Sequence, residues 1–299
     1  MKKTAQFFGV AIVTIGLLVA ALVVVAQILS ERKAHRKLDI KIAMLAADNA
    51  AVEHGRYLAE SRGCMECHGA DGRGRELIND PGGLYVKTPN ITAGLNGAVK
   101  TYNNADWVRT IRHGVKPNGE PLLIMPSEDY NRLSDIDTAA LIAYMRSLPA
   151  VDGEPGVIRL SLFVKALYAF GVIKDAAEKI DHTQPAPAPI KAAVSVEHGA
   201  YIANTCIGCH GPDLSGGKIP GGPPHWPPAA NLTPGSGSTM PVYDTVEKFM
   251  LMMRTAKRPD GSQVSKVMPF DSLKKLTDID LQALHVYLKT VQPRDVGSR

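Results

Sequence analysis

The residues best suited to chemistry are the four cysteines, which all lie in two copies of one short pattern. The copies read Cys-Met-Glu-Cys-His at residues 64–68 and Cys-Ile-Gly-Cys-His at residues 206–210. Two thiols three positions apart can form thioethers with the two vinyl groups of one haem, and the next residue, a histidine, then binds the iron as its proximal ligand. The pattern therefore predicts two covalently bound haem c groups. The predicted attachment residues are Cys64, Cys67, Cys206 and Cys209, and the predicted proximal ligands are His68 and His210.

Two other chemistries use closely spaced cysteines. A redox dithiol needs no histidine beside it and usually lies near a βαβ pattern, which we do not find in this sequence. A zinc site with four ligands would have to combine two segments, although each segment repeats a complete unit. Since no cysteine is left over, a third haem of this kind, a disulfide and a cysteine axial ligand are excluded.

Methionine is the expected ligand on the opposite side of each iron, because it raises the reduction potential and suits electron transfer. Met125 and Met268 lie 57 and 58 residues after their histidines, and a proline follows each of them. This equivalence predicts that both are distal axial ligands. Met240 also precedes a proline and is the rival for the second haem, but it has no counterpart in the first half of the chain. Four other methionines are interpreted as core residues: Met145, Met250, Met252 and Met253.

Three other histidines are weaker candidates for a distal ligand. His113 has Thr255 at its place in the second half of the chain. His54 and His198 do correspond to each other, but they precede the haem histidines by only 14 and 12 residues. We expect them to lie at a helix end or beside a haem propionate.

The similarity between the two halves extends well beyond the cysteines. A shift of about 142 residues aligns Val-Glu-His-Gly at residues 52–55 with the same residues at 196–199, and Asn-Ile-Thr at 90–92 with Asn-Leu-Thr at 231–233. The segments 133–137 and 276–280 also correspond. The sequence therefore contains a duplicated unit, with one haem expected in each copy.

Each unit is expected to be helical with long loops. Apolar periodicity predicts a short helix up to the cysteine pattern, a middle helix at residues 105–113 (246–255 in the second unit) and a final helix at residues 135–148 (278–291). Ser134 and Thr277 are the predicted N-caps of the final helices. Residues 80–97 and 216–241 are rich in glycine and proline and are expected to lack regular structure.

Residues 7–29 contain no charged side chain and are long enough to cross a hydrocarbon layer of roughly 30 Å as a helix. We interpret them as a membrane anchor. A cleaved signal peptide is the alternative, although the apolar run is longer than such signals usually have. Basic residues flank the run on both sides, so the positive-inside rule gives no single orientation. Because haem c is attached outside the cytoplasmic membrane in bacteria, we expect the rest of the chain in the periplasm, held to the inner membrane by this single helix.

The net charge of +5 is concentrated next to the anchor, because residues 1–50 hold seven basic and three acidic side chains. Contact with lipid head groups explains a basic belt beside a membrane helix. Nucleic acid is therefore not an expected partner.

The segment between the two units has an apolar part and an extended part. Residues 156–173 are apolar but contain Arg159 and Lys165, which makes them too short and too charged for a second membrane span. We expect a helix packed in the domain interface, with a surface helix on the membrane or on a partner subunit as the alternative. Residues 184–190 alternate proline and alanine and predict a semi-rigid connector. Trp226 has no counterpart in the first unit and is expected to pack in its loop against the haem or to line a docking surface.

Both units resemble the class I type cytochrome c domain. Beside Cys-x-x-Cys-His-Gly, the sequence has Thr-Pro-Asn-Ile-Thr at 88–92, Asp-Trp at 106–107, Arg-His-Gly at 112–114 and Met-Pro at 125–126. This succession is similar to the multihaem cytochrome c subunits that accompany membrane-bound alcohol, gluconate and related dehydrogenases. Those subunits commonly carry three haem domains and are anchored differently. The resemblance implies an all-α fold with long loops, in which two tandem cytochrome c domains follow the N-terminal transmembrane helix.

These observations divide the chain into a transmembrane anchor (1–30), a juxtamembrane segment (31–50), a first cytochrome c domain (51–150), an apolar helix with a Pro/Ala linker (151–195) and a second cytochrome c domain (196–299). The expected function is the relay of single electrons between a dehydrogenase or quinol-oxidising complex and a terminal oxidase, soluble cytochrome or other acceptor. A dihaem enzyme such as a peroxidase would need an open iron site, and two equivalent methionines argue against it. A cytochrome subunit fixed within a respiratory supercomplex is the third possibility.

Overall fold

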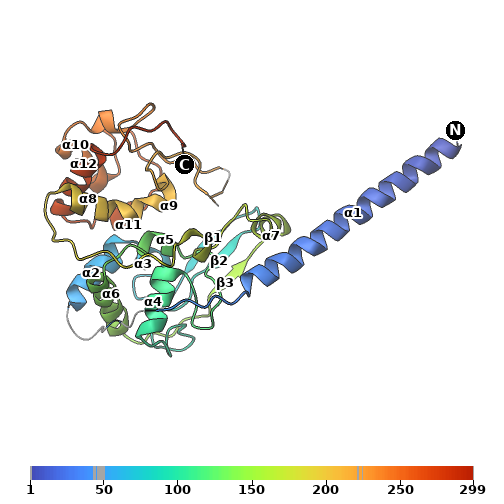
Figure 1. Ribbon diagram of the computed structural model, residues 1–299, viewed down its shortest axis with the longest axis horizontal. Coiled ribbons are helices and arrows are strands. Elements are labelled where there is room, and N and C mark those ends of the chain that lie inside the picture. The colour runs from blue at the N-terminus through green and yellow to red at the C-terminus, as the bar shows by residue number, and fades with distance from the viewer. Residues whose placement is uncertain (1, 43–44, 46–50, 221, 224, 299) are drawn as a thin grey trace.

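The protein consists of two similar helical units behind a long N-terminal helix (Figure 1). The computed structural model describes residues 2–42, 45, 51–220, 222–223 and 225–298. The described chain is mostly helical with little sheet, which confirms the predicted fold class.

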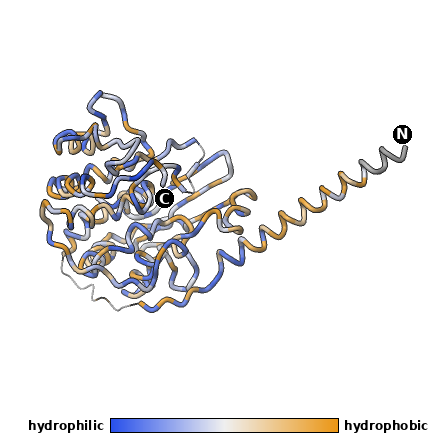
Figure 2. Tube along the Cα trace, turned by 45° about the horizontal axis from the view of Figure 1, so that its top comes forward, coloured by the Kyte–Doolittle hydropathy of each residue, from blue (hydrophilic) through white to orange (hydrophobic). Residues whose placement is uncertain are grey.

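Helix α1 (Lys2–Ala34) projects away from the two units (Figure 1). Its segment Gly9–Ala34 reaches a mean hydropathy of 2.8, and it is the one helix in the described part of the chain that is long and apolar enough to cross a membrane. Most of its large apolar side chains are exposed. Figure 2 shows hydrophobic residues (orange) along most of the coloured part of the helix. Apolar side chains that contact no protein over such a length are stable in lipid, which supports the interpretation as an anchor.

The first unit contains five helices within the described residues: α2 (Val52–Ser61), α3 (Cys64–His68), α4 (Asn104–His113), α5 (Ser127–Tyr130) and α6 (Asp135–Ser147). The second unit repeats them as α8 (Val196–Ala203), η2 (Asn204–Cys206) with α9 (Ile207–His210), α10 (Val246–Thr255), α11 (Phe270–Leu273) and α12 (Asp278–Leu288), and it adds η3 (Met240–Tyr243). The predicted middle and final helices are therefore confirmed, with small differences at their ends.

Local sequence explains where the final helices begin. The Oγ of Ser134 accepts a hydrogen bond from the backbone N–H of Asp137, and Oγ1 of Thr277 accepts one from that of Asp280, both at 3.1 Å. In α12 the Asp280 carboxylate also accepts from the N–H of Thr277, which completes a capping box. These hydrogen bonds confirm the predicted N-caps in both units. Such a cap stabilises a helix by about 1 kcal/mol.

The first and last helices of each unit cross at a glycine. A β-carbon on Gly55 would lie 2.0 Å from the carbonyl oxygen of Ala140, and one on Gly199 would lie 2.1 Å from that of Ala283. No other residue fits at these crossings without moving a helix. The repeated His-Gly pair of the sequence thus marks the closest approach of α2 to α6 and of α8 to α12.

A small antiparallel sheet is present where the sequence predicted no regular structure. It has the strand order β1 (Glu76–Asn79), β2 (Tyr85–Lys87), β3 (Val157–Arg159). The prediction for residues 80–97 was therefore wrong at β2. Its partner β3 comes from the segment between the two units, and a three-residue strand with so distant a partner leaves no periodic signal in the sequence.

The rest of the segment between the units lies beside the anchor. Helix α7 (Leu162–Ala169) packs against α1, and a short turn η1 (Ala177–Lys179) follows it. The expectation that residues 156–173 form a helix in the domain interface was wrong, because the start of the segment forms β3 and α7 packs against the anchor. Residues 184–190 have no helix or strand, as expected of an extended connector.

Candidate haem sites and the interface between them

A backbone carbonyl holds the ring of each haem-motif histidine. Nδ1 of His68 donates a hydrogen bond to the carbonyl oxygen of Pro89 (3.1 Å), and Nδ1 of His210 donates one to that of Ala230 (2.8 Å). A carbonyl can only accept, so Nδ1 carries the proton and the lone pair of the ring is on Nε2. This is the tautomer that a proximal iron ligand needs, and the carbonyl also fixes the orientation of the ring.

A buried asparagine anchors the loop that supplies each of these carbonyls. The side-chain amide of Asn90 donates to the carbonyl oxygen of Val151, and that of Asn231 donates to the carbonyl oxygen of Arg294, both at 2.8 Å. Both asparagines are almost completely buried. Because their partners follow the last helix of each unit, the asparagines tie the histidine-holding loop to the end of the unit.

The cysteines suit haem attachment better than the alternatives. All four are half-buried, and no disulfide joins them. Burial raises the pKa of Cys64 and of Cys206 to about 12, whereas a redox dithiol or a zinc thiolate needs a lowered pKa. Within the described residues, no group of three or more His, Cys, Asp or Glu side chains is arranged to hold a metal ion. Paired thiols beside an oriented histidine and an apolar core fit a covalently attached haem.

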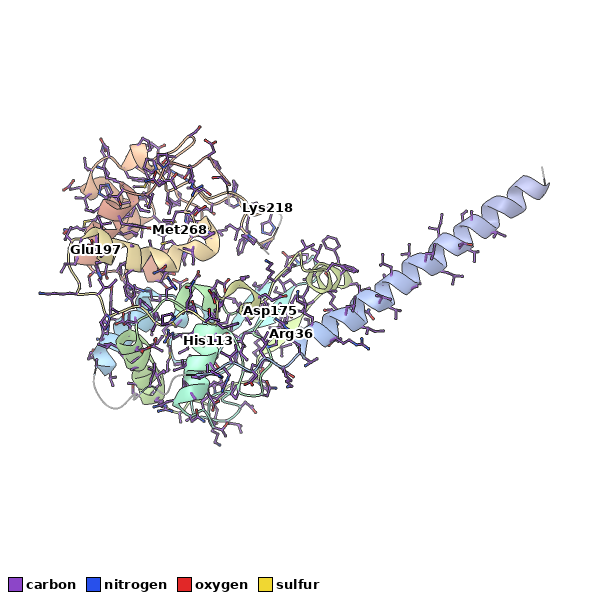
Figure 3. The ribbon with its side chains drawn as sticks, in the orientation of Figure 1. Arg36, His113, Asp175, Glu197, Lys218 and Met268 are labelled. Atoms are coloured by element: carbon purple, nitrogen blue, oxygen red, sulfur yellow. The ribbon has the colours of Figure 1, made fainter. Side chains whose placement is uncertain are left out.

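Met125 and Met268 begin the same backbone turn in the two units. The carbonyl oxygen of Met125 accepts from the N–H of Ser127, and that of Met268 accepts from the N–H of Phe270, both at 2.9 Å. The proline between them has φ −81° and ψ 64° in the first unit and φ −79° and ψ 69° in the second, which defines an inverse γ-turn. Both methionines are half-buried against the apolar core that the first cysteine of each motif also contacts. Figure 3 shows Met268 within the second unit.

Met240 lies in a different kind of backbone. It begins η3, and its backbone N–H donates to Oγ of Ser238 (3.0 Å). Its side chain is buried in the core together with Tyr243 and Phe249. Of the two Met-Pro pairs in the second unit, the one at Met268 therefore matches the first unit.

His113, a weaker candidate for a distal ligand, contacts the segment between the units. Its Nδ1 lies 3.1 Å from Nδ1 of His182, and Nε2 of His182 donates to the carbonyl oxygen of Ala177 (3.1 Å). The proton between the two rings therefore belongs to His113. This pair joins the end of α4 to the segment that leads to the second unit.

The His113–His182 contact predicts a dependence of stability on pH. Burial, followed by the effects of His182 and the neighbouring Arg112 and Arg109, lowers the pKa of His113 from 6.5 to about 4. A histidine with a lowered pKa in the folded state stabilises the fold above pH 6.5, and this contribution is lost as the pH falls toward 4. We expect the free energy of unfolding of the haem-loaded protein to fall less steeply between these pH values in His113→Gln than in the wild type. Equal slopes in denaturant titrations of the two proteins would contradict the assignment.

Each haem motif touches the opposite unit at its third residue. In the first motif the carboxylate of Glu66 accepts a hydrogen bond from Oγ of Ser272 on α11. In the second motif the backbone N–H of Gly208 donates to Oδ1 of Asp129 on α5 (2.9 Å), and a β-carbon on Gly208 would lie only 2.7 Å from that carboxylate. Figure 1 shows α3, α5, α9 and α11 between the centres of the two units. The two predicted haem motifs therefore face the same interface.

A pair of tyrosine–aspartate hydrogen bonds crosses the interface reciprocally. The hydroxyl of Tyr57 donates to the carboxylate of Asp280, and that of Tyr201 donates to the carboxylate of Asp137. Each aspartate is the N3 residue of the final helix in the opposite unit. The contacts on the two sides of the interface are thus equivalent. The first helix of each unit is hydrogen-bonded to the start of the final helix of the other unit.

Histidines complete these two clusters. Nε2 of His54 donates to Asp137 (2.7 Å), and Nε2 of His198 donates to Asp280 (2.6 Å). Burial would raise the pKa of Asp280, but its hydrogen bonds from Tyr57 and His198 hold that pKa below the usual value. The expectation that the histidines lie at a helix end is confirmed. The tyrosine–aspartate contacts were missed: the recurrence of His, Tyr and Asp in both units marks these residues in the sequence, but it does not show that the tyrosine and the aspartate of a pair come from different units.

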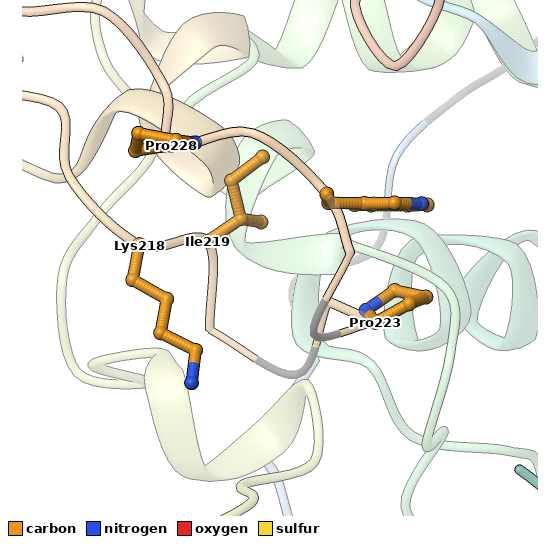
Figure 4. Close-up of a pocket in the computed structure, with 5 residues that line it drawn as sticks. Lys218, Ile219, Pro223 and Pro228 are labelled. Atoms are coloured by element: carbon orange, nitrogen blue, oxygen red, sulfur yellow. The ribbon is translucent and has the colours of Figure 1, made fainter.

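Trp226 lies in the connection between the second haem motif and Asn231, and the first unit has no tryptophan in its corresponding connection. It lines a cavity of about 310 Å³, which Figure 4 shows in close-up. The other residues that line the cavity are Lys218, Ile219, Pro223 and Pro228.

Paired thiols, oriented histidines and equivalent methionine turns are the features expected of a haem protein with covalent attachment. The cytochrome c family model matches residues 52–149 and 196–292, so the chain belongs to the cytochrome c family. Membership of this family implies covalently bound haem c and electron transfer. The resemblance seen in the sequence is thereby confirmed.

The chain is similar to cytochrome subunits of several oxidoreductases. It is 26% identical to the fructose dehydrogenase cytochrome subunit of Gluconobacter japonicus, over 82% of this chain and 54% of that protein. It is 37% identical to the gluconate 2-dehydrogenase cytochrome c subunit of Pantoea cypripedii, over 33% of this chain and 23% of that protein. It is 31% identical to the cbb3-type cytochrome c oxidase subunit CcoP of Helicobacter pylori (strain 52), over 34% of this chain and 29% of that protein. The chain thus spans about half the length of the first relative and less of the others.

Proposed function

We propose that this protein is a membrane-anchored dihaem cytochrome c that relays single electrons on the periplasmic side of the inner membrane. It would connect a dehydrogenase or quinol-oxidising complex with a terminal oxidase or another acceptor. The observation that carries this proposal is that both haem motifs face one interface, since an internal relay needs two redox sites close together.

Each unit would hold its haem with one set of equivalent residues. Cys64 and Cys67 would attach the first haem, and Cys206 and Cys209 the second. The axial ligands would be His68 with Met125 in the first unit and His210 with Met268 in the second. Bound in this way, the haem iron supplies reversible one-electron chemistry.

The protein's own residues would keep each iron six-coordinate and dry. The carbonyls of Pro89 and Ala230 orient the histidine rings, and the asparagine after each carbonyl prevents its loop from moving. The inverse γ-turns present the two methionines in the same way. The apolar core around them excludes water, which raises the potential and lowers the reorganisation that accompanies each electron.

The comparisons and the anchor support the choice of partners and location. The relatives are cytochrome subunits of dehydrogenases and of an oxidase, so an electron carrier between such complexes is the favoured role. Helix α1 supports attachment to a membrane, and the attachment chemistry of haem c supports the periplasmic side.

The test is purification of the full-length tagged chain from its own membranes in mild detergent. We expect redox subunits to copurify, and the substrate of a copurifying dehydrogenase to reduce both haems in absorbance spectra. The matched control is the double variant Cys206→Ala/Cys209→Ala, in which about half of the reducible haem signal should be lost. A high-spin ferric iron with rapid turnover of peroxide would instead identify an enzyme and contradict the proposal.

A further inference from the structure

Helix α7 packs against α1 at the end of the apolar span. On α1, Ala26 and Ser30 lie four residues apart on one face, and both are almost completely buried. In the described part of the chain, α7 is the element that packs extensively against α1. Small residues with this spacing let two helices approach closely. Helix α7 therefore lies at the height at which the apolar span ends.

Polar contacts fix α7 to α1 along this side. The Nζ of Lys33 donates to the carbonyl oxygen of Tyr168 (2.9 Å) and lies 4.4 Å from the centre of its ring. Lys165 on α7 forms an ion pair with Glu31 on α1 (2.8 Å). The two contacts follow the same order along both segments: Lys165 pairs with Glu31, and Tyr168, three residues later, pairs with Lys33.

An ion pair to the buried Asp175 joins the segment after α7 to the residues that follow α1. The guanidinium of Arg36 donates two hydrogen bonds to the carboxylate of Asp175, at 2.6 and 2.9 Å, and the hydroxyl of Tyr168 donates a third at 2.8 Å. Burial alone would raise the pKa of Asp175, but Arg36 and Tyr168 hold it below its usual value. Figure 3 shows Arg36 and Asp175 together where α1 meets the first unit. The segment after α7 is thus fixed to the anchor as well.

Large apolar side chains of this segment face away from the protein. Leu162 and Phe163 at the start of α7 are 54% and 72% exposed, and Phe170 and Val172 just after it are 56% and 70% exposed. Figure 2 shows hydrophobic residues (orange) in both segments where α7 packs against α1. Four large exposed apolar residues beside a membrane anchor form a surface that water solvates poorly.

We propose that α7 and the turn after it are a second membrane contact, in which these four side chains enter the interface of the lipid bilayer beside α1. Lipid is the occupant because the four exposed side chains belong to a segment that packs against the anchor where the apolar span of α1 ends. Contact with the membrane through both α1 and the α7 segment would fix the tilt of the two haem units relative to the bilayer. A single membrane-spanning helix does not fix this tilt. The proposal rests on the membrane anchoring described above.

The test places a nitroxide spin label at single added cysteines in the full-length, haem-loaded protein. All four native cysteines would be bonded to haem under the proposed function. A nitroxide reagent would therefore react only with the cysteine added in Phe163→Cys, Leu18→Cys or Leu251→Cys. Leu18 lies in the apolar span, and Leu251 is a 60% exposed apolar residue of α10 in the second unit. The protein is placed in vesicles of phosphatidylethanolamine and phosphatidylglycerol, and collisions of each label with oxygen and with a water-soluble nickel complex are compared.

We expect the label at position 163 to favour oxygen over nickel several-fold relative to the label at 251, as the label at position 18 does. Equal nickel accessibility at 163 and 251, with position 18 shielded, would overturn the proposal while leaving the anchor intact. Nickel accessibility at position 18 would instead contradict the anchoring itself. A label at 163 that is open to nickel in vesicles but shielded from both reagents in a copurified complex would identify a protein partner and also overturn the proposal.

Discussion

Replacing Met268 by alanine is expected to lower the reduction potential of one haem by on the order of 0.1 V, within the roughly 0.8 V range that axial ligands span. Loss of the thioether removes the ligand that favours the reduced iron. The other haem should keep its potential, because its own methionine turn lies in the first unit. The measurement is a spectroscopic potentiometric titration of the purified protein, in which one of two transitions should move.

Met240→Ala is the matched control for Met268→Ala. Met240 is buried in the core of the same unit, so its removal is expected to destabilise the fold by about 2–5 kcal/mol through the cavity it leaves, without shifting either potential. If Met240→Ala lowered a potential and Met268→Ala did not, Met240 would be the sixth ligand. The same comparison with Met125→Ala should move the other transition.

Removing both interface tyrosine hydroxyls is expected to destabilise the pairing of the two units by about 3–6 kcal/mol, since a hydrogen bond to a charged group contributes about 1.5–3 kcal/mol. In Tyr57→Phe/Tyr201→Phe the rings remain, but Asp280 and Asp137 each lose a donor from the opposite unit. We expect one unfolding transition in the wild type and two in the double variant, one for each unit. The measurement is denaturant unfolding followed by far-ultraviolet circular dichroism and by haem absorbance.

Tyr85→Phe provides a comparison outside this interface. Tyr85 lies on β2, where its ring packs under Arg159, and the substitution also removes one hydroxyl while keeping the ring. Its unfolding should resemble that of the wild type. The account of the interface is wrong if the double variant is no less stable than Tyr85→Phe.

Features set by neighbouring residues could be predicted from the sequence. The motifs at 64–68 and 206–210, the caps at Ser134 and Thr277 and the final helices depend on contacts within a few residues of the chain. The equivalence of Met125 and Met268 was also visible, because the duplicated unit provides two copies of each site. Their inverse γ-turns show that the equivalence extends to the backbone.

Features set by distant partners could not be predicted in the same way. Strand β2 exists because β3 pairs with it from beyond the first unit, and α7 finds its place through Ala26 and Asp175 rather than through its own periodicity. The bonds from Tyr57 to Asp280 and from Tyr201 to Asp137 join residues more than 60 positions apart. Their side chains recur in both units, but the sequence does not show that each partner lies in the opposite unit.

Counting the haems of the mature, full-length protein tests the account most directly. The pyridine haemochrome assay combined with the intact mass of the purified chain measures both the amount of haem and its covalent attachment. The account predicts two haem c groups per chain, with each of Cys64→Ala/Cys67→Ala and Cys206→Ala/Cys209→Ala retaining one. A mature chain that carries no covalent haem, or only one, would contradict it.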